Sequence, residues 1–172
     1  MPGPIINVAE GETHSGSHGD YFAYEMTELS LPLGGKAIGA NITRVPPGKA
    51  AFPQHHHYGE EEHFFILGGT GILRYGSEAY PVKPQDYIVN LPGGPETAHQ
   101  LVNTGAEDLV YLAISNMAVP EVVGFPDSNK TMSRIDDRWQ PDSRFFVPDS
   151  AKGEGQSWDG EDGREVAKIV KG

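Results

Sequence analysis

Apolar and polar residues alternate in short runs along the first two thirds of the chain, and glycine, proline and asparagine separate these runs. Alternation with a period of two is typical of strands that bury one face, and turns about 8 to 12 residues apart are typical of a β-sandwich or barrel. The pattern predicts an all-β fold with nine strands, at residues 22–29, 36–45, 50–57, 62–67, 72–75, 78–82, 86–90, 99–103 and 109–116.

The pattern changes after Ala118, where three Pro-Asp-Ser triplets and the glycine-rich stretch 152–163 interrupt the alternation. Such sequences are typical of loops, so we expect an irregular extension that packs on the barrel, with a helix only at residues 164–170. The organisation predicted is an N-terminal arm at residues 1–20, a β-barrel at 21–118 and a C-terminal extension at 119–172. The extension has too little apolar periodicity for a core of its own.

Composition narrows the possible partners and the compartment. The formal net charge of −11 disfavours binding to nucleic acid or to an anionic membrane, because both repel an acidic surface. The chain has no cysteine, and its first residues show neither a basic leader nor an apolar targeting segment. We therefore expect a cytoplasmic protein without disulfides or thiolate metal sites.

Four of the seven histidines lie in the stretch HHHYGEEEHFFILGG, which starts at His55. Side chains two apart on a strand share a face, so His55 and His57 point the same way. If the chain reverses after His57, Glu62 returns to that face, and His99 can join from the strand HQLVN. The pattern predicts a metal site formed by His55, His57, Glu62 and His99.

Imidazole nitrogen and carboxylate oxygen suit a divalent transition metal such as Mn, Fe, Ni or Zn. Four protein ligands would leave positions open for a substrate. Glu61 would replace Glu62 as the ligand if the turn were one residue shorter. The remaining polar candidates are interpreted as surface or supporting residues: His14, His18, His56, His63, Glu60, Arg44 and Arg74.

Two motifs in the sequence resemble those of the cupins, a family of small β-barrels. Gly48, His55, His57, Glu62 and Gly69 match the first cupin motif, although six residues rather than five separate Gly48 from His55. The second motif is matched at its latter part, by Pro92, Gly94, His99 and Asn103, with Gln85 in place of its first glycine and a longer stretch before His99. The resemblance covers about residues 38–116.

The resemblance implies a double-stranded β-helix, or jelly roll. The tail sequences FPDS and WDGE are also similar to those of single-domain bacterial cupins, some of which carry the provisional name sugar phosphate isomerase. Three functions are therefore open. The first is a metalloenzyme that uses the ion as a Lewis acid on an oxygen-chelating small molecule, with Glu62 as ligand or catalytic base, in an isomerase, epimerase or decarboxylase reaction on a sugar phosphate or a hydroxy or keto acid.

The second possible function is an Fe(II)-dependent dioxygenase, in which the open metal positions bind substrate and O₂ together. The third is a non-catalytic module that binds a small ligand. For all three we expect a homodimer, because the edge strands of a single jelly roll and the arms at both ends of this chain favour pairing with a second copy.

Overall fold

The computed structural model describes residues 3–135 and 143–148 of the 172-residue chain. Within these residues the regular elements are strands and single 3₁₀ turns, with no α-helix, and no helix is long and apolar enough to cross a membrane. The strands are β1 (Thr13–His18), β2 (Phe22–Glu28), β3 (Gly39–Val45), β4 (His56–His57), β5 (Glu62–Gly68), β6 (Gly71–Tyr75), β7 (Glu78–Val82), β8 (Tyr87–Asn90), β9 (His99–Asn103), β10 (Leu109–Ser115), β11 (Glu121–Phe125), β12 (Lys130–Arg134) and β13 (Arg144–Pro148). The 3₁₀ turns are η1 (Val8–Glu10), η2 (Leu31–Leu33), η3 (Pro95–Thr97) and η4 (Pro126–Ser128).

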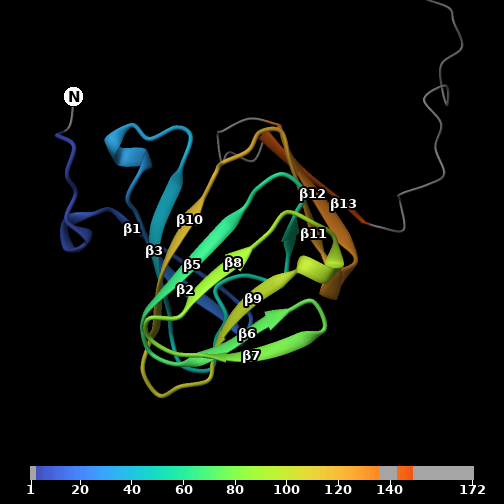
Figure 1. Cartoon of the computed structure of the whole chain (residues 1–172), viewed down its shortest axis with the longest axis horizontal. Helices are drawn as coiled ribbons and strands as arrows, with labels where there is room; N and C mark the ends of the chain where they lie inside the picture. The colour runs from blue at the N-terminus through green and yellow to red at the C-terminus, as the bar shows by residue number, and fades with distance from the viewer. Residues whose placement is uncertain (1–2, 136–142, 149–172) are drawn as a thin grey trace, which may run out of the picture.

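The strands form one large antiparallel sheet and two smaller ones. The six-stranded sheet has the order β1-β2-β3-β10-β5-β8, and the smaller sheets have the orders β13-β12-β11-β4 and β7-β6-β9. Isolated bridges join Ala50 to Val102 and His55 to His99, so the chain before β4 connects the two smaller sheets. In Figure 1, β10, β5 and β8 lie side by side, with the β6–β7 hairpin below them and β11, β12 and β13 at the right. The chain is therefore all-β, as predicted, and folds as a double-stranded β-helix.

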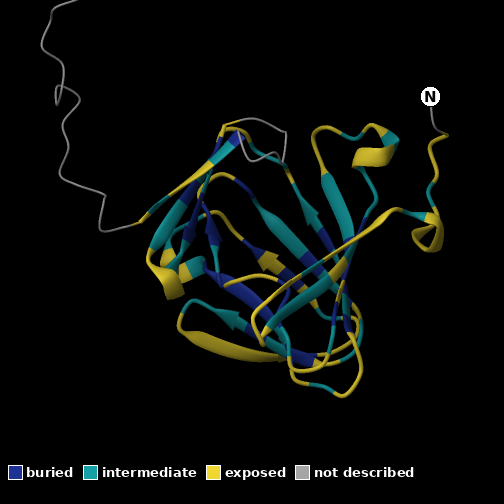
Figure 2. Ribbon diagram, turned by 180° about the vertical axis from the view of Figure 1, so that it is seen from behind, coloured by how far each residue is buried: buried dark blue, intermediate teal, exposed yellow. Residues whose placement is uncertain are grey.

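The apolar core fills the space that the sheets enclose. Alternate residues of β10 point inward, and Leu109, Tyr111 and Ala113 are all buried. Phe64 and Ile66 of β5 join them from the neighbouring strand. Figure 2 shows the buried residues concentrated in the strands around this interior, whereas most turns are exposed. The period of two therefore places the core as the sequence predicted, because only one face of each strand is apolar.

The predicted strand at residues 50–57 is shorter in the structure. Regular pairing is limited to β4, with isolated bridges from Ala50 to Phe22 and Val102 and from His55 to His99. Pro53 lies between the bridges, and proline has no N–H to donate to a sheet. The segment therefore crosses from one small sheet to the other instead of continuing in one.

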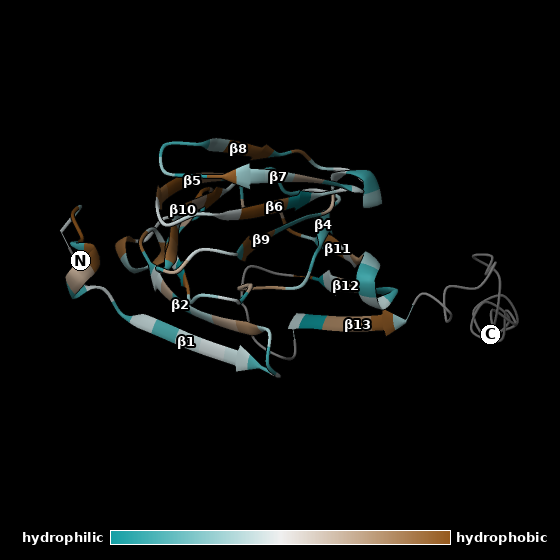
Figure 3. Cartoon of the chain, turned by 90° about the horizontal axis from the view of Figure 1, so that it is seen from below, coloured by the Kyte–Doolittle hydropathy of each residue, from teal (hydrophilic) through white to brown (hydrophobic). Residues whose placement is uncertain are grey.

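Strands also form where loops were expected, at both ends of the barrel. Within the predicted N-terminal arm, β1 pairs with β2 along its full length, from Thr13 opposite Thr27 to His18 opposite Phe22. The sequence of β1, THSGSH, has no apolar residue, and Figure 3 shows it pale to teal throughout. Its pairing rests on backbone hydrogen bonds, which leave no hydrophobic pattern in the sequence.

The predicted C-terminal extension contains β11, β12 and β13, which pair antiparallel in that order. The expectation of loops was wrong here because the innermost residues of β11 and β12 include the charged Glu121 and Arg134, both 1% exposed. Buried charges do not give the apolar alternation that predicts a strand. The helix expected at 164–170 lies outside the described residues, and the domain boundaries stay predictions.

Candidate metal centre

One end of the barrel interior brings His55, His57, Glu62 and His99 together. Each residue offers one ligand atom, and these four atoms all lie within 4.8 Å of one another. We call these residues the His/Glu cluster. His55 and His99 face each other across an antiparallel bridge with two backbone hydrogen bonds, and their ring centroids are 4.7 Å apart. The Nε2 atom of His99 lies 3.0 Å from Oε2 of Glu62.

Strand geometry accounts for this convergence. Along β5, Glu62 shares its inward face with the core residues Phe64 and Ile66, while the intervening His63 and Phe65 point away from the interior. The chain reverses between His57 and Glu62, as the sequence analysis required. The spacing of the motif therefore places the carboxylate of Glu62 beside the imidazoles, and Glu61 is not part of the cluster.

Backbone carbonyls orient two of the imidazoles. Nδ1 of His55 lies 2.9 Å from the carbonyl oxygen of Pro53, and Nδ1 of His99 lies 3.2 Å from that of Thr97. Since a carbonyl only accepts, each Nδ1 carries the proton and donates it. The Nε2 atom of His55 is then left with a lone pair, which is the form that binds a metal, whereas Nε2 of His99 lies at hydrogen-bond distance from the carboxylate of Glu62, which also only accepts.

His57 is oriented by carboxylates instead. Its Nδ1 lies 3.5 Å from Oε1 of Glu121 and 3.7 Å from Oε2 of Glu60. Neither ring nitrogen makes a hydrogen bond of normal length within the described residues, although the side chain is buried. A buried nitrogen without a partner is unfavourable unless something binds it, so the donor set fits a metal ion.

The electrostatics favour the metal-binding protonation state at His55 and Glu62 and favour a proton on His57. Burial and the neighbouring His99 and His57 lower the pKa of His55 to about 3. Burial would raise the pKa of Glu62, but its hydrogen bond to His99 and the other imidazoles outweigh burial and lower it to about 2. At neutral pH, His55 is therefore neutral and Glu62 is ionised. For His57, burial lowers the pKa, but the carboxylates of Glu121, Glu62 and Glu60 outweigh it and raise the pKa overall.

Two buried carboxylates next to His57, those of Glu60 and Glu121, and the buried Arg134 that is bonded to Glu60 were not recognised from the sequence. Glu60 was interpreted as a solvated turn residue, but it is 5% exposed, and Nη2 of Arg134 donates a hydrogen bond to it. Glu121 accepts hydrogen bonds at Oε1 from the backbone N–H groups of Tyr58 and Gly59, at 3.1 and 3.2 Å. These hydrogen bonds to Arg134, Tyr58 and Gly59 join residues 62 to 74 positions apart in the chain, so no local pattern could reveal them.

The other polar candidates lie outside the cluster. His56 was expected on the opposite face from His57, and it is buried there, with Nδ1 2.8 Å from the carbonyl oxygen of Gly93. His63 contacts Glu61 and Tyr87 on the outer face. Arg74 is engaged by Asp127, by Gln54 and by Gln100. The remaining candidates His14, His18 and Arg44 are exposed.

A buried amide lies beside the cluster. Asn90 is directly opposite Glu62 in the pairing of β5 with β8, and it shares its inward face with Ile88 of the core. It is 1% exposed, and neither Oδ1 nor Nδ2 has a hydrogen-bond partner within the described residues. The sequence analysis did not single it out, because a lone asparagine at the end of a strand is usually a turn residue.

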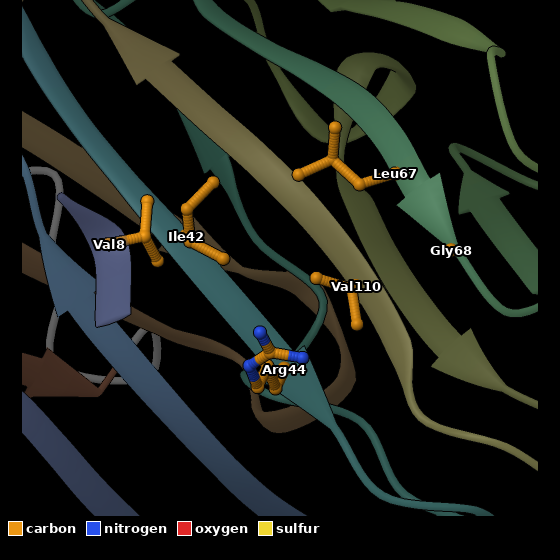
Figure 4. A pocket seen from close by; sticks show the side chains of 6 residues that line it. All are labelled: Val8, Ile42, Arg44, Leu67, Gly68 and Val110. Carbon is orange, nitrogen blue, oxygen red and sulfur yellow. The ribbon is translucent and has the colours of Figure 1, made fainter.

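A cavity of about 20 Å³ adjoins the cluster inside the barrel. His55, His99, Phe64 and Tyr111 contribute to its walls, and it has room for about one water molecule. A larger hollow of about 330 Å³ lies on the outer face of the six-stranded sheet, where Ile42, Arg44, Val110 and Leu67 surround it (Figure 4). None of the residues that line this outer hollow belongs to the His/Glu cluster.

Comparison with known proteins agrees with the fold and the site. Residues 41–115 match the family model described as Cupin domain. Over 71 residues the chain is 34% identical to an oxalate-binding protein of Thermotoga maritima, which is 41% of this chain and 55% of that protein. The chain thus spans about half the length of this curated relative.

Solved structures extend the comparison beyond the matched segment. A protein of Acidithiobacillus ferrooxidans, provisionally named a sugar phosphate isomerase, is 28% identical with a TM-score of 0.65, over 77% of this chain and 81% of that one. A predicted oxalate decarboxylase of Thermotoga maritima is 27% identical with a TM-score of 0.58, over 65% of this chain and 97% of that one. A cupin from Silicibacter pomeroyi, 19% identical with a TM-score of 0.75 over 86% of this chain and 94% of its own, shares the fold. Residues 41–115 thus match a cupin domain, and the chain shares the double-stranded β-helix of these structures.

Proposed function

We propose that His55, His57, Glu62 and His99 bind one divalent transition metal ion, and that the ion in turn binds a small oxygen-chelating acid such as oxalate. The observation that carries the proposal is the convergence of the four candidate ligand atoms within 4.8 Å, with the Nε2 lone pair of His55 directed away from its carbonyl partner. Three neutral imidazoles and one carboxylate suit Mn, Fe, Ni or Zn, so the identity of the ion is open.

The size of the interior favours a small ligand. The cavity beside the cluster holds about one water molecule, so a two-carbon diacid needs less rearrangement than a sugar phosphate. The 34% identity to an oxalate-binding protein over 71 residues supports the same class. Arg74, which could have bound a phosphate, is already engaged by Asp127.

A bound divalent ion would supply Lewis acidity to a coordinated oxygen of the substrate. The chain's own contribution begins with Glu62, which is ionised and 3.0 Å from His99, so it can act either as a ligand or as the base that accepts a proton from the substrate. Phe64 and Tyr111 line the cavity and keep bulk water from it. Asn90, whose amide has no hydrogen-bond partner among residues 3–135 and 143–148, can offer it to an oxygen of the ligand or to a water.

The first experiment measures metal in protein purified without a histidine tag. We expect about one transition metal ion per chain by mass spectrometry in the wild type. The His57→Ala variant should contain almost none, and the control variant His18→Ala, which alters an exposed histidine on β1, should match the wild type. A metal content in His57→Ala equal to that of the wild type would show that the ligand assignment is wrong.

The second experiment titrates oxalate into metal-loaded and metal-free protein by calorimetry. We expect oxalate to bind only to the metal-loaded protein. Glycolate and pyruvate should bind to it more weakly in the same assay. Equal heats for both forms would place the ligand away from the metal. Turnover of the bound acid, followed by NMR, then separates an enzyme from the non-catalytic binding module.

A sugar phosphate isomerase is the second candidate function. It is supported by the 28% identity and TM-score of 0.65 with the Acidithiobacillus ferrooxidans protein over most of both chains. Incubation of metal-loaded protein with a panel of aldose and ketose phosphates, followed by NMR, tests it. Interconversion in wild-type protein and its loss in His57→Ala would favour this candidate over the oxalate-type acid. The Fe(II) dioxygenase and the homodimer stay predictions from the sequence.

A further inference from the structure

The charged residues behind His57 form a second layer of the site, and most of it comes from outside the segment that matches the cupin family. Glu60 lies in the turn between β4 and β5, but Glu121 and Arg134 belong to β11 and β12, beyond residue 115. All three are at most 5% exposed. We call them the carboxylate layer.

We propose that Glu121 is a positioning residue for the metal centre: it fixes the ring of His57 and supplies negative charge that a divalent cation balances. This inference rests on the metal binding proposed above. The role is distinct from that of the four ligands, because Glu121 acts on the ion through His57.

The contacts of Glu121 set both the turn and the ring. Its Oε1 accepts hydrogen bonds from the N–H groups of Tyr58 and Gly59, which fixes the backbone directly after His57. The same oxygen lies 3.5 Å from Nδ1 of His57. A carboxylate beside one imidazole nitrogen favours the proton there and leaves the lone pair on the other nitrogen, toward the cluster. Nε2 of His57 is a buried atom without a hydrogen-bond partner in the described part of the chain, as a metal-ligand nitrogen would be before the ion binds.

The charges of the layer point to the same role. With the imidazoles neutral, the carboxylates of Glu60, Glu62 and Glu121 and the guanidinium of Arg134 leave a formal charge of −2 among these described residues. Arg134 is bonded to Glu60 and to the carbonyl oxygen of Ala118. The carboxylate of Glu121 lies beside His57, and within the part of the chain that the structure describes its Oε2 makes no hydrogen bond. A divalent ion would neutralise the set, so the layer favours an occupied site.

A purely structural role for Glu121 predicts something different. If the carboxylate only held the turn, its replacement would lower the stability of the metal-free protein and leave metal affinity unchanged. The positioning role predicts the reverse. Without the metal, removing one of the clustered negative charges relieves repulsion, so the metal-free protein should be as stable as before or more stable.

The test titrates Co²⁺ into metal-free protein and follows the absorption bands of the bound ion. The main variant is Glu121→Gln, because the amide oxygen still accepts from both backbone N–H groups while the charge is lost. We expect the dissociation constant for Co²⁺ to rise about 10- to 100-fold, with altered bands, as is typical when an outer partner of a metal ligand is removed. The melting temperature of the metal-free variant should not fall.

Two further variants complete the experiment. Glu78→Gln removes the same charge from the exposed face of β7 and should leave both readouts at wild-type values. Glu121→Asp keeps the charge on a shorter side chain and should give an affinity between those of the wild type and Glu121→Gln; it also carries the test if Glu121→Gln does not fold. A Co²⁺ affinity within about threefold of wild type in both Glu121 variants would overturn the positioning role. Absence of Co²⁺ binding to the wild type would instead overturn the metal site itself.

Discussion

The two ends of the barrel interior are built from the same strands but have opposite character. On β5, Glu62 is at the site end, and the next inward residues, Phe64 and Ile66, belong to the core. On β9, His99 is at the site end and Leu101 follows it into the core. On each strand, the candidate metal ligand is thus only two residues away from the first residue of the apolar core. These apolar core residues exclude water from one side of the cluster and strengthen the electrostatic interactions within it.

Two buried asparagines show what this difference means for polar groups. Asn103, at the closed end, donates from Nδ2 to the carbonyl oxygens of Val45 and Glu107, and its Oδ1 accepts from the N–H of Gly105. Asn90, at the site end, makes no hydrogen bond within the described residues. At the closed end, polar groups are satisfied and hold loops together. At the site end, buried polar atoms are left available, which is favourable only where a ligand or ion binds.

The largest expected effect separates stability from binding. Ile66 is 0% exposed, so Ile66→Ala should lower the free energy of unfolding by about 2 to 5 kcal/mol, through lost burial and the cavity left behind. Urea unfolding of the metal-free protein measures this. The neighbouring Leu67 lies on the outer face and is 47% exposed, so Leu67→Ala should lower the free energy of unfolding by less than about 1 kcal/mol.

If the two ends of the barrel interior act separately, folded Ile66→Ala protein should still bind Co²⁺ with nearly wild-type affinity. A loss of affinity as large as that of His57→Ala would show that the two ends are one cooperative unit and that the contrast drawn above is wrong.

The asparagine pair gives the second largest effect. Asn103→Ala removes three hydrogen bonds at about 1 kcal/mol each and leaves buried backbone groups unpaired, so we expect a loss of about 2 to 3 kcal/mol. Asn90→Ala removes no hydrogen bond of the metal-free protein and should change the free energy of unfolding by less than about 1 kcal/mol. Instead it should weaken oxalate binding to the loaded protein. Similar losses of stability in both variants would mean that Asn90 is also a structural residue.

The grouping of the candidate ligands could be predicted from the sequence because most of their geometry is local. A period of two and one reversal of the chain place His55, His57 and Glu62 together, and the structure brings His99 to them as the second motif indicated. That these residues bind a metal stays a proposal. The core followed from the same alternation along β5 and β10.

The carboxylate layer could not be predicted in this way. Glu121 and Arg134 satisfy buried charge through partners that are 60 to 74 residues away in the sequence. In the sequence alone, Glu121 and Arg134 each look like a residue of the protein surface. The strands that carry them were missed for the same reason, since a charge at an inward position interrupts the apolar alternation from which strands are predicted.

The third prediction concerns acid. The pKa of His55 is about 3 in the fold and near 6.5 when unfolded, so between these values the unfolded chain binds more protons at this residue. The contribution of His55 to stability is therefore lost as the pH falls from about 6.5 toward 3, by at most about 1.4 kcal/mol per pH unit. Urea unfolding of metal-free wild type and His55→Asn at pH 7, 6 and 5 measures the difference between them. The wild type should lose stability relative to the variant as the pH is lowered. A pH-independent difference would mean that His55 titrates normally in the fold.

The smallest effect is expected outside the barrel interior, at a polar cluster that is satisfied but exposed. Arg74 of β6 makes paired hydrogen bonds to Asp127 of η4, at 2.8 and 3.0 Å, and the two side chains are 38% and 51% exposed. The guanidinium holds the pKa of Asp127 below its usual range, so the pair contributes stability above that usual range, and the contribution is lost as the pH falls. Because water and salt screen exposed charges, Asp127→Asn should lower the free energy of unfolding by no more than about 1 kcal/mol at neutral pH. Unfolding at low salt and at about 1 M salt measures the screening, and the difference between variant and wild type should shrink at high salt.

Co²⁺ affinity should not change. A weaker affinity in Asp127→Asn would show that η4 supports the metal centre from outside, and the contrast between the two ends would then extend to the surface of the barrel.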